Sequence, residues 1–161
     1  MSRQSKAELL AALSPAFRAH QRAVDALDEA AAAVFGINRT DLRGLDVLLE
    51  RGTATPTALA EELGLTSGSV TALLDRLERA GYAERAADPD DRRRTRVRPT
   101  RRAAHLAERI YGPLAGEGGQ LMARYSAGEL KAFLDFLQWG RALQDAHAAR
   151  VRAMPAARAS R

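Results

Sequence analysis

Residues 55–81 read TPTALAEELGLTSGSVTALLDRLERAG, a stretch that contains the start and stop signals of two short amphipathic helices. Thr55 can cap the first helix through its hydroxyl, and Pro56 suits the first helical position, where no backbone N–H is needed. Thr66 can cap the second helix in the same way, and Gly81 can end it. Because only a glycine and a leucine separate the two helices, they are expected to cross at a steep angle as a helix-turn-helix.

The second helix, predicted over residues 67–80, has one apolar and one polar face. Its apolar side chains recur at helical spacing, so this face is expected to be buried. They are Val70, Leu73, Leu74 and Leu77. The hydroxyl side chains of the opposite face are Ser67, Ser69 and Thr71. Arg76 is the cation of that outward face, and Asp75 opposes it. A face of this kind can read base edges but gains little from phosphates.

A β-hairpin is predicted to follow the second helix directly, over residues 82–98. Residues 82–85 have the character of a strand, and residues 94–98 alternate as a returning strand. Between them, the sequence DPDD at residues 88–91 is typical of a tight turn. A hairpin in this position is the wing of a winged helix-turn-helix, predicted over residues 38–100.

The predicted wing holds the excess positive charge of the chain. Between Arg85 and Arg102 there are eight arginines and three aspartates, a local balance of +5, which equals the net charge of the whole chain. The acids, Asp91 among them, are expected to brace the tip by charge-assisted hydrogen bonds. The arginines are then free to reach phosphates or the narrow minor groove. The candidate DNA-binding arginines of the wing are Arg92, Arg93, Arg94 and Arg96.

A long amphipathic helix is predicted before the helix-turn-helix, over residues 5–35. Its apolar residues from Leu10 to Val34 alternate in spacings of three and four, which places them on one stripe. Pro15 is expected to interrupt this helix, since proline removes a backbone donor and clashes with the preceding turn. The prediction therefore leaves open whether the helix is continuous or forms two pieces.

The carboxy-terminal third, residues 101–148, is also predicted to be helical. One helix is expected to bend or break near Gly112-Pro113, and a last helix from Ser126 carries a second apolar stripe. A single winged helix cannot cover both stripes, so burial against a second copy of the chain is expected. Packing of the two stripes within one chain is the alternative. The basic end, residues 150–161, is predicted to be a disordered tail.

The composition excludes several functional classes. The 161-residue chain contains no cysteine, so disulfides and thiolate chemistry are absent. No apolar run is long enough to span a membrane, and no signal peptide is evident, so a single-domain cytoplasmic protein without a membrane partner is expected. The three histidines, His20, His105 and His147, are too scattered to indicate a metal site. No convergent set of titratable groups points to an enzyme, and no cofactor is expected.

The ordered set LAEELGL, VTALLDRLERAG and DPDDRR resembles the core of the MarR (multiple antibiotic resistance regulator) family of winged-helix transcription factors. The resemblance extends over roughly residues 8–148. It implies a mainly α fold with a small β-hairpin wing, and a homodimer formed by the helices at both ends of the chain. It also implies binding to an inverted repeat in double-stranded DNA, with residues 67–80 in the major groove and residues 82–98 along the minor groove.

Individual residues match the family pattern in part. Asp91, Arg92 and Arg93 match the wing signature, and Arg76 matches an arginine of the recognition helix. Many members carry an arginine where this chain has Ala72, so base readout there differs. The sequence PTRR at residues 99–102 replaces a leucine-threonine pair and a glycine-containing turn. Without cysteine, thiol-based peroxide sensing is excluded.

The resemblance also implies a repressor that releases DNA when a small aromatic or phenolic effector binds between the dimerisation helices and the winged helix. Phe17, His20 and Asp46 would then lie near an amphipathic pocket. The alternative for His20 is a satisfied or interfacial histidine, and for Asp46 a solvated or arginine-paired carboxylate. A winged-helix module that binds protein instead of DNA is the alternative function, although the basic wing disfavours it.

Overall fold

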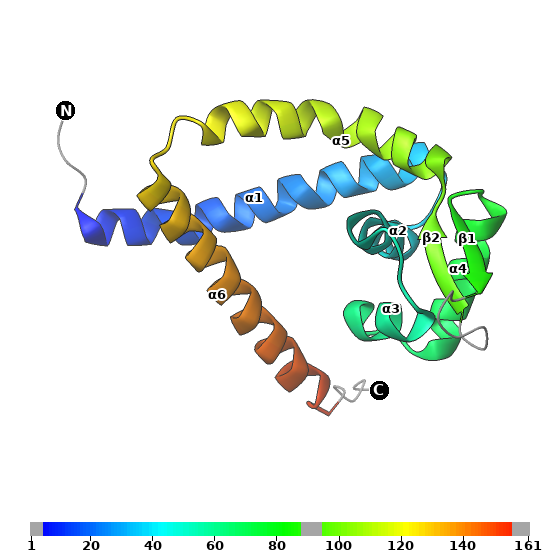
Figure 1. Ribbon diagram of the computed structural model, residues 1–161. Helices are drawn as coiled ribbons and strands as arrows, with labels where there is room; N and C mark the ends of the chain where they lie inside the picture. The colour runs from blue at the N-terminus through cyan, green and yellow to red at the C-terminus, as the bar shows by residue number, and fades with distance from the viewer. Residues whose placement is uncertain (1–4, 88–94, 156–161) are drawn as a thin grey trace. The chain divides into compact units, whose positions relative to one another are not determined.

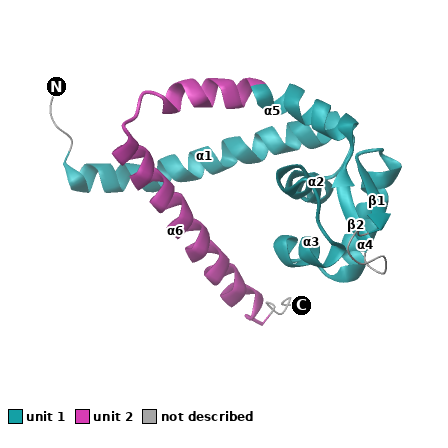
Figure 2. Cartoon of the chain, in the orientation of Figure 1, with its two compact units in different colours: residues 1–112 teal, residues 113–161 magenta. Residues whose placement is uncertain are grey.

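The structure, a computed structural model, describes residues 5–87 and 95–155. Most of the described chain is helical, with one two-stranded hairpin (Figure 1). The elements are α1 (Lys6–Phe35), α2 (Arg39–Arg51), α3 (Pro56–Leu63), α4 (Ser67–Arg79), β1 (Ala83–Ala87), β2 (Thr95–Pro99), α5 (Arg101–Met122) and α6 (Ala127–Arg152). The chain divides into two compact units, residues 1–112 and residues 113–161 (Figure 2).

Helix α1 is one continuous helix. It begins with a capping box, in which the backbone N–H of Glu8 donates to Ser5 Oγ at 3.2 Å and the backbone N–H of Ser5 donates to Glu8 Oε2 at 2.7 Å. Pro15 lies inside the helix and does not divide it, so of the two possibilities left open by the sequence the continuous helix is the one that forms. The start signal is Ser5, and the one hydrogen bond that proline removes is a small part of a helix of 30 residues. Gly36 ends the helix with a φ of 67°.

The helix-turn-helix forms as predicted. Thr55 accepts a hydrogen bond from the backbone N–H of Ala58 at 3.2 Å, and Thr66 accepts one from Ser69 at 3.3 Å. Gly64 closes α3 in the left-handed conformation, with a φ of 65°. The side chains of α4 that are fully buried are those predicted from spacing, namely Val70, Leu73, Leu74 and Leu77. Helix α4 ends at Arg79, one residue before the predicted end.

Helix α2 packs closely against α4 at a glycine. A Cβ atom added at Gly44 would lie 2.8 Å from Leu73 Cδ2 and 3.0 Å from Leu73 Cδ1, which is shorter than a van der Waals contact. Leu45 and Leu48 of α2 are fully buried in the same core. The Leu73 side chain therefore occupies the space that a side chain at residue 44 would need.

The wing is a short antiparallel hairpin. Ala83 pairs with Pro99 and Arg85 pairs with Val97, so the strands extend from residue 83 to 87 and from 95 to 99. Val97 also forms an isolated bridge with Ala54, with N···O distances of 2.9 and 2.8 Å. Strand β1 begins at Ala83, one residue later than predicted, and β2 ends at Pro99, also one residue later than predicted. The predicted turn at residues 88–91 lies outside the described residues.

The base of the wing is joined to α1 through Tyr82. Its hydroxyl donates to the backbone carbonyl of Phe35 at 2.9 Å, and the two rings meet edge to face with centroids 5.1 Å apart. The guanidinium of Arg102, in the first turn of α5, lies 5.0 Å from the centroid of the Tyr82 ring. This buried tyrosine thus connects α1, α5 and the start of the hairpin.

Helix α5 continues through Gly112 and Pro113 and through the GEGG sequence that follows. Of the predicted bend or break, the break is therefore wrong, and the bend stays a prediction. Its start is fixed by Thr100, whose hydroxyl oxygen accepts from the backbone N–H of Ala103 at 3.2 Å. The division between the two compact units nevertheless falls between Gly112 and Pro113. Helix α6 starts with a second capping box at Ser126 and extends to Arg152, into the predicted tail. Residues 156–161 of that tail lie outside the described residues.

Large apolar side chains are exposed on α1 and on α6. None of the residues of α6 is buried within the described chain. Its exposed apolar residues are Phe133, Leu134, Phe136, Leu137, Trp139, Leu143 and Val151. Those of α1 are Leu9, Leu10, Leu13, Phe17, Val24 and Val34. Apolar area of this kind on two long helices is typical of a surface that a partner covers.

Candidate nucleic-acid interface

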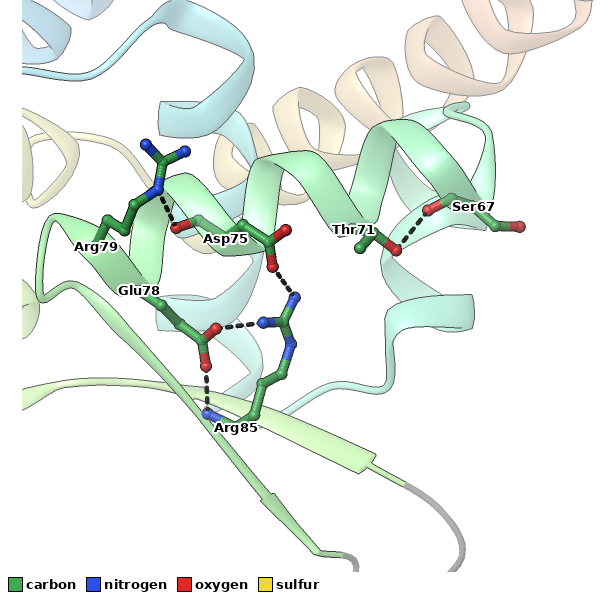
Figure 3. A network of polar contacts seen from close by, with 6 residues as sticks. All are labelled: Ser67, Thr71, Asp75, Glu78, Arg79 and Arg85. Carbon is green, nitrogen blue, oxygen red and sulfur yellow. Dashed lines mark hydrogen bonds and ion pairs between the residues drawn. The ribbon is translucent and has the colours of Figure 1, made fainter.

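The amino-terminal half of α4 presents small hydroxyl side chains to solvent. Ser67, Ser69 and Thr71 are all exposed. The hydroxyls of Thr66 and Ser69 are 2.9 Å apart, and Thr71 Oγ1 donates to the backbone carbonyl of Ser67 at 3.0 Å (Figure 3). A hydroxyl that donates locally keeps its acceptor lone pairs, so Thr71 retains the capacity to accept from a base edge. Whether these residues contact DNA stays a prediction.

Arg76, predicted to bind DNA, makes a two-pronged contact with Asp41 of α2. Its Nε donates to Asp41 Oδ2 at 2.8 Å and its Nη2 donates to Asp41 Oδ1 at 2.6 Å. The Asp41 side chain is 2% exposed, whereas that of Arg76 is 38% exposed. The hydrogen bond to Asp41 is the main reason that the pKa of Arg76 is raised above its usual value. The guanidinium therefore joins α4 to α2, with one edge still open to solvent.

Asp41 was not recognised as a site residue from the sequence. Its carboxylate also accepts from Asn38 Nδ2 at 2.8 Å, and its backbone N–H donates to Asn38 Oδ1 at 2.9 Å. The local signal, an acid in the first turn of a helix that Asn38 caps, predicts only a favourable helix dipole interaction. Its pairing with an arginine 35 residues away depends on how α2 and α4 cross.

Arg85, at the third position of β1, is bonded to two acids of α4 (Figure 3). Its backbone N–H donates to Glu78 Oε1 at 3.0 Å, and its guanidinium forms a short ion pair with Glu78 Oε2. The same guanidinium donates to Asp75 Oδ1 at 2.8 Å. Asp75, predicted to oppose Arg76, pairs directly with Arg85, because β1 passes along that side of α4. Its charge also contributes to the raised pKa of Arg76.

The other predicted wing residues are only partly described. Arg96 lies on β2 and is half-buried. Arg98 pairs with Glu84, its partner across the hairpin, at 2.8 Å. Asp91 and the arginines at residues 92–94 lie outside the described residues. Arg85 and Arg98 have carboxylate partners, so part of the positive charge counted in the sequence is already neutralised within the protein.

A hollow of about 740 Å³ lies beside α4. Its walls come from the carboxy-terminal part of α1, the start of α2 and the side of α4 that carries Ser69, Ala72 and Arg76. Arg39 also lines it, and this guanidinium is held by the Asp25 carboxylate at 3.1 Å and the Asp28 carboxylate at 3.3 Å. The surface of the hollow is thus formed by apolar side chains and by charges that are already paired.

The three residues predicted to bind an effector do not line this hollow. Phe17 and His20 are exposed on α1, whereas Asp46 is on α2. Burial raises the pKa of the Asp46 carboxyl, and the nearby negative charges of Glu50 and Asp28 raise it further.

A tyrosine of α5 shares the environment of Asp46. Burial raises the pKa of Tyr111 above its usual value, and the charges of Asp28 and Asp46 add to this effect. Among the described residues, no group of three or more histidines and acids could hold a metal ion. Within the same part of the chain, no helix has both the length and the apolar character needed to cross a membrane.

Comparison with known proteins identifies the family. Residues 35–94 match the model of the MarR family. The chain is 36% identical over 136 residues to the HTH-type transcriptional regulator YcgE of Bacillus subtilis (strain 168), which covers 84% of this chain and 88% of that protein. The chain belongs to the MarR family. The resemblance to this family seen in the sequence is therefore confirmed, and this MarR-family protein is a winged-helix transcriptional regulator.

Solved structures of other MarR proteins share the fold. A MepR variant from S. aureus bound to an oligodeoxyribonucleotide superposes with a TM-score of 0.56 at 21% identity, covering 82% of this chain and 97% of that one. NadR in complex with 4-hydroxyphenylacetate superposes with a TM-score of 0.59 at 24% identity, covering 86% and 96%. The predicted mainly α winged helix-turn-helix is thus confirmed.

Proposed function

We propose that this MarR protein is a homodimeric repressor that binds an inverted repeat in DNA and responds to a small effector. The observation that carries the proposal is the arrangement of α4: its apolar face is fully buried, its hydroxyl face is exposed, and the same helix is bonded to the hairpin through Arg85. An exposed helix face next to a wing is the docking geometry of helix-turn-helix proteins, with the helix in the major groove.

The proposed contacts divide between the two elements. Ser67, Ser69 and Thr71 would read base edges in the major groove, with Arg76 at the end of this row. The arginines of the wing would bind phosphates or enter the minor groove. These are Arg92, Arg93, Arg94 and Arg96. Asp91 would brace the wing.

Dimerisation is supported by the exposed apolar residues of α1 and α6. A second copy related by a two-fold axis would cover the same surface on both chains, and it would present two α4 helices to half-sites about one helical turn apart. Light scattering at micromolar concentration is expected to give the mass of two chains. A stable, folded monomer would contradict this part of the proposal.

The effector is proposed to be a small aromatic or phenolic molecule. NadR, which shares the fold, has been crystallised with the phenolic acid 4-hydroxyphenylacetate. Phe17 would supply an aromatic contact, and His20 and Asp46 would supply polar ones. The effector would act by favouring a dimer whose half-site spacing does not fit the operator. Unchanged effector response in a His20→Ala, Asp46→Ala double variant would remove these residues from the site.

Selection of random duplexes by the purified protein is the decisive experiment. Enrichment of an inverted repeat, with binding that weakens steeply as salt rises, is the expected result. A protein that enriches no duplex, but captures another protein through the hairpin, would favour the protein-interaction function instead. A cytoplasmic location follows from the proposal, because the operator is part of the chromosome.

A further inference from the structure

We propose that Arg85 is a positioning residue for DNA binding, which locks the wing to the recognition helix so that both elements meet the duplex as one body. The inference rests on the proposed function, in which α4 and the hairpin both contact DNA. It assigns to Arg85, which lies in the basic segment but is not among the candidate DNA-binding arginines, a role inside the protein.

The contacts of Arg85 join two successive turns of α4 to one point of β1. Asp75 and Glu78 are three residues apart, so their carboxylates lie on the same side of the helix. The guanidinium bonds to both carboxylates. The backbone N–H of Arg85 adds the third bond of this network, which goes to Glu78 at 3.0 Å (Figure 3). A planar guanidinium can bridge two carboxylates in this way, whereas the compact ammonium of lysine cannot hold the same geometry.

The position of Arg85 within the hairpin makes these contacts effective. Its partner across the hairpin, Val97, is fully buried, so β1 is held on the core up to this residue. The next two residues of β1, Ala86 and Ala87, are small and exposed. Among the described residues of β1, Arg85 is thus the outermost one whose side chain bonds to α4. The direction in which the hairpin leaves the core is set there.

The network also places two acids beside the surface proposed to contact DNA. Unpaired, Asp75 and Glu78 would repel phosphates, and Arg85 neutralises that charge locally. Two explanations of Arg85 therefore make opposite predictions for Glu78. If charge alone mattered, removal of the acid would strengthen DNA binding. If Arg85 positions the wing through Glu78, removal of the acid weakens DNA binding.

The test measures operator affinity of the full chain by fluorescence anisotropy, using the duplex enriched from random sequences. Glu78→Gln is expected to bind at least about five-fold more weakly than the wild type, in the range found for side chains that act in one network. Arg85→Lys, which keeps the charge, is expected to lose a similar factor. Glu61→Gln, which removes an exposed acid of α3, is the charge-matched control and is expected to bind as tightly as the wild type or slightly more tightly.

A double-mutant cycle keeps the test decisive if single variants lose stability. The effects of Arg85→Ala and Glu78→Ala on operator affinity are expected to be non-additive. The double variant should bind no more weakly than the single variant with the lower affinity. Tighter or unchanged binding by Glu78→Gln, or wild-type affinity in Arg85→Lys, would overturn the inference. Failure of the wild type itself to bind any duplex would contradict the proposed function, and the two failures are therefore distinguishable.

Discussion

Arg76 of the recognition helix and Asp41 of α2 form a two-pronged ion pair, with N···O distances of 2.8 and 2.6 Å, and the carboxylate is buried while the guanidinium is partly exposed. The pair therefore couples the helix proposed to read DNA to the helix behind it. Arg76, which was predicted to contact DNA, thus also joins α4 to α2 within the protein. Loss of Arg76 would affect both the proposed DNA contact and the ion pair between the helices. Asp41 is therefore the better position at which to test the ion pair alone.

Asp41→Asn is expected to lower the free energy of unfolding by about 1–3 kcal/mol, because the substitution removes charge-assisted hydrogen bonds from a buried position. Urea denaturation at neutral pH measures the change. Asp25→Asn is the control, since Asp25 pairs with Arg39 at the surface and is expected to contribute less than about 1 kcal/mol. Equal losses of unfolding free energy in the two variants would show that burial of Asp41 does not strengthen its ion pair with Arg76.

Gly44→Ala is expected to destabilise the protein by about 1–3 kcal/mol, the usual cost of overpacking a core. The added methyl group would lie 2.8 Å from Leu73 Cδ2, so the buried Leu73 side chain or the two helices would have to move. Gly68→Ala provides the comparison, because no atom lies within 4 Å of the added Cβ there and alanine favours a helix. Thermal melts followed by circular dichroism are expected to move in opposite directions for the two variants.

Asp46→Asn is expected to stabilise the protein at neutral pH and to have little effect in acid. The pKa of the folded-state carboxyl is raised by burial and by Glu50 and Asp28. The folded state therefore favours the protonated form, and this stabilising contribution is present below the ordinary pKa of aspartate and lost as the pH rises through the raised value. The gain is expected to stay below about 1 kcal/mol, because the side chain is solvent-accessible.

Melting temperatures of wild type and Asp46→Asn, compared at pH 7.5 and near pH 3.5, measure this difference. A stabilisation of the same size at both values would mean that the effect comes from packing and not from the charge of Asp46.

Arg93→Ala in both subunits is expected to weaken specific and nonspecific DNA binding alike, by at least about 1 kcal/mol. It should reduce the slope of log affinity against log salt by about 2, since each neutralised phosphate contributes roughly 0.9. Asp91→Ala distinguishes a direct contact from bracing of the wing tip. Bracing predicts a comparable loss in both variants, whereas direct contact predicts a smaller loss for Asp91→Ala. Wild-type affinity and slope in Arg93→Ala would exclude a dominant role of the wing.

Local signals in the sequence were sufficient for the helix-turn-helix. The caps at Thr55 and Thr66 act within three residues, and the buried face of α4 follows from spacing alone. The proline signals were overestimated. Pro15 and Pro113 lie inside long helices, where the hydrogen bonds of the neighbouring turns keep the backbone helical.

The ion pairs of the site could not be predicted in the same way. Asp41 and Arg76 are 35 residues apart, and Arg85 reaches α4 only because β1 returns along it. Sequence reasoning assigned the charge of Arg76 to the DNA side and counted Arg85 only in the charge balance of the basic segment. Which carboxylates neutralise them depends on tertiary packing, and this information is absent from local patterns.

The bridge between Ala54 and Val97 has a consequence for how the family can vary in sequence. Both backbone groups of Val97 are bonded to Ala54, so the short connection between α2 and α3 acts as a third strand of the hairpin. An inserted residue in that connection would shift its register against β2 and reverse the side chains that face the core. Over evolutionary time, insertions and deletions should therefore be rejected in the connection before α3.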